Sequence, residues 1–237
     1  SLAHNCEVTI CRAADDQTTL EAVGTDTFLS LFSAEAVGET LECKVESLNH
    51  GNSQSEENKI IIKTGFAVGN ELHIDIFGSS DVRCEVDFNT ASFKITGSGD
   101  ITAPHFGVCD VEIMGSGDVT LSDVSEKLQV GITGDFLCGS AKDPQLTVTG
   151  AGDITVKDIS GEAAVNLTGS GDMTLGGSVH TIRIVATGSG DINASRLTAE
   201  NACIRADGPC DITIGRIING SEEKLSKTST LKVIKRG

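Results

Sequence analysis

The residues of this sequence with the clearest capacity for chemistry are aspartates that return at regular intervals. Eight of them follow one another at spacings of 17 to 20 residues. Carboxylates held in such a series could bind Ca²⁺, which takes oxygen ligands, or form the carboxylate pair of a retaining glycosidase. The eight are Asp81, Asp100, Asp118, Asp135, Asp153, Asp172, Asp191 and Asp211.

Each aspartate lies in a short glycine-rich motif, next to its last residue. The carboxylates are therefore positioned by a repeated sequence unit. Residues 96–101 read Thr-Gly-Ser-Gly-Asp-Ile, with close copies at 114–119, 149–154, 168–173 and 187–192. Degenerate copies lie at 77–82, 131–136 and 207–212. A period near twenty residues is typical of stacked supersecondary units.

Apolar residues keep fixed places around each aspartate. They occur seven and five places before it and one and three places after it, with another six or seven places after it. In the unit that ends at Asp135 the two preceding places belong to Leu128 and Val130, which puts Val130 in the column of Ile113. This alternation predicts two short strands flanking a glycine turn, and a third short side. Glycine suits such turns because it reaches positive φ and because its small size lets turns stack closely.

The repeat predicts an all-β fold, a single-stranded parallel β-helix of about eight rungs. We place the coil at residues 66–215, a β-rich N-terminal capping region at 1–65 and a C-terminal capping segment at 216–237. A β-sandwich is the rival fold, but antiparallel hairpins would not need one turn chemistry at every second connection.

The Gly-Ser-Gly-Asp-Ile/Val units at 97–101, 115–119 and 188–192 resemble the putative auto-transporter adhesin family with its head GIN domain. The resemblance extends over the repeats, about two thirds of the chain. It implies a bacterial β-helical protein outside the cytoplasm, with an adhesive or structural role. It supplies no catalytic residues.

Composition excludes some partners. A formal charge of −16 disfavours nucleic acid and anionic membranes, and no apolar run is long enough for a membrane-spanning helix. No secretory signal is visible, which is consistent with its removal. Among the eight cysteines, Cys84, Cys109 and Cys138 occupy inward places. Pairing within Cys6, Cys11 and Cys43, or between Cys203 and Cys210, stays open.

The ends of the chain depart from the repeat. We expect strands near residues 7–11, 18–23, 41–45 and 59–64, a short helix within 25–37 and a mobile polar loop at 46–58. Residues 71–77 begin the coil, and 231–235 alternate as a last strand whose sheet the sequence does not decide. Both ends are expected to cover the open edges of the coil.

The simplest interpretation of the aspartate series is structural. Carboxylates about 4.8 Å apart would repel by ~0.9 kcal/mol in water and by ~3.5 kcal/mol at an effective dielectric constant near 20. Hydrogen bonds from turn amides and hydroxyls would offset this. The alternative is bound Ca²⁺, with candidate ligands Asp100, Asp118, Asp153, Asp172 and Asp191. Catalysis is disfavoured because it needs one distinguished pair with separated pKa values.

The sequence gives little support for ice binding or for carbohydrate recognition by aromatic stacking. Outward threonines two places after the aspartates resemble ice-binding arrays, but threonine is an ordinary strand residue. They are Thr102, Thr120, Thr155, Thr174 and Thr213. Trp and Tyr are absent, which weakens carbohydrate recognition by stacking and leaves polar recognition.

The sequence thus predicts a non-enzymatic, extracytoplasmic, adhesin-like or structural binding module without catalytic residues or a required cofactor. Its partner would be a surface glycan, a protein or another copy of the chain. The alternatives are a polysaccharide-acting β-helix hydrolase or lyase and a calcium-stabilised surface protein.

Overall fold

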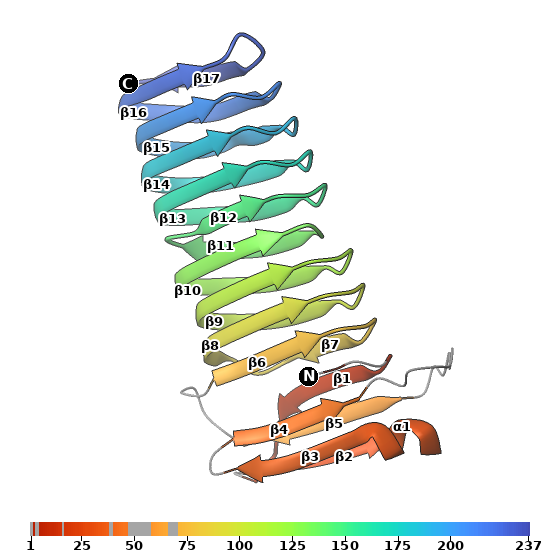
Figure 1. The fold of residues 1–237 in the computed structure, drawn as a ribbon. Helices are drawn as coiled ribbons and strands as arrows, with labels where there is room; N and C mark the ends of the chain where they lie inside the picture. Colours follow the sequence, from red (N-terminus) through yellow and green to blue (C-terminus); the bar gives the residue numbers. More distant parts are fainter. Residues whose placement is uncertain (1, 3–4, 16, 38–39, 47–57, 66–70) are drawn as a thin grey trace.

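The chain folds into a tall stack of parallel coils. The structure, a computed structural model, describes residues 2, 5–15, 17–37, 40–46, 58–65 and 71–237. It is an all-β solenoid of about nine turns, with the N-terminal region at the base of Figure 1 and the C-terminus at its top. The predicted parallel β-helix is confirmed.

The coil starts with three short strands and continues with longer, bent ones. The first three are β6 (Glu71–Ile76), β7 (Asp81–Cys84) and β8 (Phe88–Ile95). Each pairs in parallel with the strand one turn away. The longer strands are β9 (Ile101–Ile113), β10 (Val119–Ile132), β13 (Ile154–Leu167), β14 (Met173–Ala186), β15 (Ile192–Ala206) and β16 (Asp211–Leu225). One turn differs, because it is divided into β11 (Phe136–Lys142) and β12 (Gln145–Val148).

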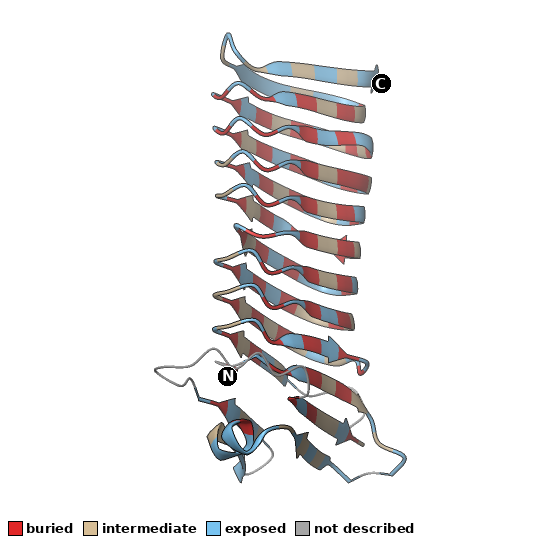
Figure 2. Cartoon of the chain, turned by 90° about the vertical axis from the view of Figure 1, so that its right-hand side faces the viewer, coloured by how far each residue is buried: buried red, intermediate tan, exposed pale blue. Residues whose placement is uncertain are grey.

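The core is a continuous apolar column inside the coils. Figure 2 shows buried residues alternating with exposed ones along the strands of the stack. The places one and three after each aspartate are filled, for example, by Ile154 and Val156, whose side chains are fully buried. Phe93 and Phe106 meet edge to face within the column, with ring centroids 5.5 Å apart. Burial of this column is the main source of stability for the coil.

The prediction that Val130 lies in the column of Ile113 is wrong. Ile132 lies beside Ile113 of β9 and Val148 of β12, whereas Val130 pairs with Val111. The reason is a turn shortened by two residues, since only Thr133 and Gly134 separate Ile132 from Asp135. A shift of two preserves the alternation of a strand, so Leu128 and Val130 are still buried.

The glycine turns owe their sequence to close stacking. A Cβ atom on Gly97 would overlap the carbonyl oxygen of Gly78 one turn below, and a Cβ atom on Gly171 would overlap that of Gly152. Among the described glycines, positive φ occurs only at Gly161, Gly177 and Gly237, outside these turns. The expectation that the turns need positive φ is therefore wrong, and the expectation that they need small residues is correct.

The N-terminal region extends the stack and closes its base. The strand β1 (Glu7–Arg12) lies between β7 and β5 (Lys59–Thr64) and is parallel to both. The antiparallel strand β2 (Thr19–Val23) forms the edge beside β5. A second sheet holds β3 (Phe32–Val37) and β4 (Thr40–Val45), which are antiparallel.

The predicted helix exists but is short. It is α1 (Asp26–Leu31), and Thr25 Oγ1 caps it by accepting a hydrogen bond from the N–H of Phe28 at 3.2 Å. Phe28 is fully buried and packs on Phe32. The helix ends where β3 begins to pair with β4, so the second half of the expected helical segment is strand. Most of the predicted polar loop, residues 47–57, lies outside the described residues.

The C-terminal end is closed partly by a last strand and partly by polar groups. The last strand, β17 (Thr230–Arg236), pairs in parallel with the first part of β16 and so adds a final partial turn. The second half of β16 is not covered by β17. There Glu223 occupies the inward place above Ile204. It accepts hydrogen bonds from Ser221 Oγ at 2.5 Å and from Arg236 Nη2 at 2.6 Å. These bonds lower the pKa of Glu223.

Candidate functional site

The aspartates form a single file along one corner of the coil. The residues that follow them pair directly from turn to turn, as Ile101 does with Val119 and Ile154 does with Met173. The regular spacing in the sequence therefore becomes a vertical column, as predicted. The outward orientation of the carboxylates is also confirmed, since the aspartates are exposed.

The carboxylates from Asp81 to Asp191 are used by the backbone of the next turn. Asp153 Oδ1 accepts a hydrogen bond from the N–H of Asp172 at 2.7 Å, and Asp172 Oδ1 accepts one from the N–H of Asp191 at 2.8 Å. The same bond links Asp81 to Asp100, Asp100 to Asp118, Asp135 to Asp153 and Asp191 to Asp211, at 2.8–3.0 Å. The aspartate side chain thus accepts the hydrogen bond that a backbone carbonyl would accept in the parallel strands on either side of the turn.

Asp118 has the most perturbed environment in this column. Burial raises its pKa, the neighbouring carboxylates of Asp100 and Asp135 raise it further, and a hydrogen bond from the backbone of Asp135 opposes the rise. It borders a surface hollow of about 380 Å³ that Asp135 and Asp153 also line. The three carboxylates belong to successive turns, since Val119 pairs with Phe136 and Phe136 pairs with Ile154.

The column does not single out a catalytic pair, because the same contact recurs at successive turns. In the described part of the chain, no three His, Cys, Asp or Glu side chains are arranged to hold a metal ion. One oxygen of each candidate calcium ligand is engaged by a backbone N–H, and the second oxygens remain. Calcium binding by Asp100, Asp118, Asp153, Asp172 and Asp191 stays the untested alternative to the structural role.

A second file of polar groups follows the third side of the coil. His105 Nδ1 lies 2.6 Å from Asp123 Oδ2, and Ser140 Oγ donates to the other oxygen of Asp123. Asp158 is the next residue in this register. A nucleophilic triad requires histidine between serine and the carboxylate. Here the carboxylate lies in the middle, so Ser140 has no adjacent base.

The remaining candidates have structural places. The threonine file is interrupted by Leu137 and Asn193, which occupy the same register. Burial raises the pKa of the Cys84 thiol to about 11 and that of Cys138 to about 12, so neither is a ready nucleophile. Cys210 is buried, and Cys203 alternates with the inward residues Ala202 and Ile204, so the two thiols are both free.

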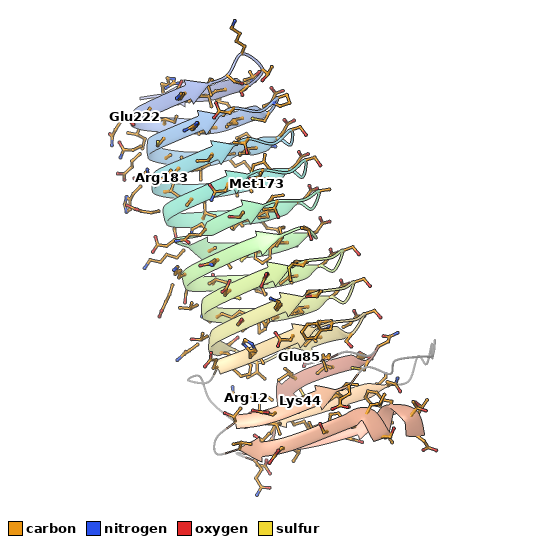
Figure 3. All side chains as sticks on the ribbon, viewed as in Figure 1. Arg12, Lys44, Glu85, Met173, Arg183 and Glu222 are labelled. Carbon is orange, nitrogen blue, oxygen red and sulfur yellow. The ribbon has the colours of Figure 1, made fainter. Side chains whose placement is uncertain are left out.

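Sequence reasoning missed a groove at the divided turn. It measures about 550 Å³ and crosses the corner between β11 and β12. Its polar lining comes from four successive turns: Glu126 and Lys127 on β10, Asp143 and Gln145 on the divided turn, Glu162 on β13, and Thr181 and Arg183 on β14. We call this feature the corner groove. Figure 3 shows Arg183 at this edge of the stack, projecting outward.

The corner groove exists because the divided turn takes a shorter path. Lys142 pairs with Ser160 and Gln145 pairs with Ala164, so two residues of this turn face three of β13. Toward β10, three residues between Ala141 and Gln145 face the four between Val124 and Gln129. The adjacent turns therefore overhang a recess.

Asp143 and Pro144 build this short path. Asp143 has a φ of 47°, the only positive value at a described residue other than glycine. Its Oδ1 accepts a hydrogen bond from the N–H of Glu162 at 2.8 Å, and the carbonyl of the buried Pro144 accepts one from Ala164 at 2.9 Å. The Asp-Pro pair is a turn signal that the sequence displays. That signal does not reveal the overhang, which depends on the neighbouring turns.

Two of three comparisons with known proteins gave a match. Residues 138–217 match the protein family described as "Putative auto-transporter adhesin, head GIN domain", which confirms the resemblance over that segment. Among solved structures, a putative adhesin from Bacteroides fragilis NCTC 9343 is similar at 17% identity and a TM-score of 0.43. The alignment covers 100% of this chain and 90% of that one. No match was found among curated proteins.

Proposed function

We propose that this chain, whose residues 138–217 match the head GIN domain family of auto-transporter adhesins, is a non-enzymatic binding module that works outside the cytoplasm. The observation that carries the proposal is the distribution of chemistry in the coil. The interior is filled with apolar side chains, and the charged groups of the coil lie on its outer faces. Such a molecule offers ligands a long rigid surface.

Several features support this role over catalysis. The repeated carboxylates are committed to backbone N–H groups of the next turn. In the His105–Asp123–Ser140 file the serine donates to a carboxylate, and the histidine lies on the far side of that carboxylate, which is not the order of a nucleophilic triad. No helix in the described part of the chain has the length and hydropathy of a membrane span. With a charge of −16, the surface favours partners other than nucleic acid or anionic lipid.

The proposal is tested by adhesion and by turnover in parallel. Fluorescently labelled protein is added to bacterial and animal cells, and bound signal is measured against heat-unfolded protein. We expect saturable binding by the folded chain alone. The same preparation is incubated with a panel of polysaccharides, and specific turnover that Asp153→Asn abolishes would show an enzyme of the β-helix class instead. Absence of saturable binding to any surface would also overturn the proposal.

A further inference from the structure

The corner groove is a recess at the turn that is divided into β11 and β12. Its volume of about 550 Å³ falls within the range of ~300–1,000 Å³ typical of small-ligand sites. Its floor includes Ala163 and Ala164, whose small side chains leave the recess unfilled. A left-handed backbone at an aspartate is uncommon and often marks a site with a role beyond packing.

The charged side chains of the groove are available to a ligand. Within the part of the chain that the structure describes, no ion pair shorter than 4.0 Å includes Glu126, Lys127, Glu162 or Arg183. Elsewhere on the coil, charges at facing positions do pair, as Lys94 Nζ and Glu112 Oε2 do at 2.9 Å. The groove therefore presents four charged groups whose hydrogen-bonding capacity is not taken up within the molecule.

These charges are arranged in two similar pairs. One lip of the groove carries Glu126 and Lys127 from β10, and the other carries Glu162 and Arg183 from β13 and β14. Each lip thus offers one acceptor and one donor, with Arg183 two residues along from Thr181, the partner of Glu162 in the register. A pair of neighbouring hydroxyl groups on a sugar ring matches this arrangement, because one hydroxyl can donate to the carboxylate while the other accepts from the cation.

Alternative ligand classes fit less well. A simple anion would meet the carboxylates of Glu126, Asp143 and Glu162, and a metal ion would meet Lys127 and Arg183. A flat aromatic or apolar ligand would find no aromatic ring and no large apolar side chain in the lining. Hydroxyl groups, which both donate and accept, are compatible with every polar member.

We propose that the corner groove binds a hydroxyl-rich segment of a glycan through paired hydroxyl groups. This inference rests on the proposed function, since it names a ligand class for the binding module. The groove is open at the surface and crosses several turns, so a sugar inside a longer chain could enter it from the side. The turn-forming bond from Glu162 N–H to Asp143 holds the floor in place.

The test is binding to an array of immobilised neutral and acidic oligosaccharides, followed by titration of the strongest one. Three double variants are compared with the unmodified chain. Two remove one lip each: Glu126→Gln with Lys127→Gln, and Glu162→Gln with Arg183→Gln. The control, Glu222→Gln with Lys224→Gln, removes one acid and one base from exposed positions near the C-terminal end of the same side, where Glu222 lies two turns above Arg183. Thermal unfolding verifies that all variants fold.

We expect the unmodified chain and the control to bind the same oligosaccharides. Each lip variant should bind at least ~10-fold more weakly, the effect of losing a charged hydrogen-bonding partner. Unchanged binding in both lip variants, or no binding by the unmodified chain, would overturn the inference. Cell-surface binding measured on the same variants separates the two proposals, because its persistence without glycan binding would leave the binding module intact and remove only the glycan site.

Discussion

At the scale of single residues, the aspartate column shows how a repeated charge is tolerated. The carboxylates from Asp81 to Asp191 accept a hydrogen bond from a backbone N–H of the adjacent turn, for example Asp100 from Asp118 at 2.9 Å. A hydrogen bond to an ionised group contributes about 1.5–3 kcal/mol when it is well formed. This is comparable to the repulsion between successive carboxylates, and it explains why the motif ends in aspartate.

Asp118 should oppose folding at neutral pH. Its pKa is raised in the folded protein, so the folded state binds a proton more readily than the unfolded state. Stability is therefore lost as the pH rises from the normal carboxyl range through the raised pKa. We expect Asp118→Asn to increase the thermal midpoint at pH 7, with a gain that shrinks below pH ~4, where the native carboxyl is protonated.

Thermal unfolding of both proteins between pH 3 and pH 8 measures this effect. Asp172→Asn is the control, because that side chain accepts the same kind of bond. A gain that does not depend on pH, or an equal pH-dependent gain in the control, would contradict the explanation.

Calcium gives a second prediction at the residue scale. Because one oxygen of each carboxylate in the column is bonded to the backbone, we expect millimolar Ca²⁺ to leave the thermal midpoint unchanged relative to chelator. A rise of several degrees, lost when Asp153 and Asp172 are replaced by Asn, would instead support calcium ligation by the column.

At the scale of the element, the glycine turn is dictated by its neighbours above and below. A Cβ atom at the second glycine of a turn meets the carbonyl oxygen of the turn beneath, as at Gly171 over Gly152. The degenerate turn at Thr133 adapts differently. Its hydroxyl accepts a hydrogen bond from the N–H of Gly115 at 2.9 Å, which ties the shortened turn to the turn beneath. The turn sequence is thus a consequence of stacking.

Gly171→Ala should accordingly destabilise the coil. The added methyl group displaces backbone that cannot rotate away, and overpacking of this kind costs about 1–3 kcal/mol. The matched control is Gly131→Ala, since a Cβ there meets nothing within 4 Å and its φ is not positive. Urea unfolding measures both. Equal losses would show that glycine is needed for something other than close approach.

At the scale of the whole molecule, the two ends of the stack are closed by different means. The base is covered by α1 and antiparallel strands, with Phe28 fully buried (Figure 1). The top has no helix. Leu231 and Val233 of β17 cover one side of the inward column, and the places above Ile204 and Ile217 are taken by the ion pair of Glu223 and Arg236. Inward-pointing charge at an open edge is a known protection against edge-to-edge association.

Glu223→Leu should therefore promote association of the coils through their C-terminal ends. The change extends the apolar column to the surface and leaves Arg236 without its carboxylate partner. Light scattering across a range of concentrations should reveal dimers or larger species for this variant. Glu222→Leu, at the adjacent outward position, should remain like the unmodified chain, and association of both variants to the same extent would argue against a role for the inward charge.

The sequence by itself determined the coil, its direction of alternation and the alignment of the aspartates. A period near twenty residues with one turn motif admits few packings, because each unit must bury its apolar face on the next. It also predicted β1, β2, β4, β5 and β17 within a residue or two, from alternation and turn signals. It could not resolve the partner of Ile132, since a deletion of two residues leaves the burial pattern unchanged.

Only the tertiary structure decided the features that depend on contacts between turns. The overlap at Gly171, the bond from one aspartate to the next, the charged closure by Glu223 and the corner groove all involve residues 13 to 57 places apart in the chain. Their geometry depends on how long each turn is relative to its neighbours. A local sequence pattern predicts the shape of one turn. The corner groove arises because one turn is shorter than the turns on either side of it.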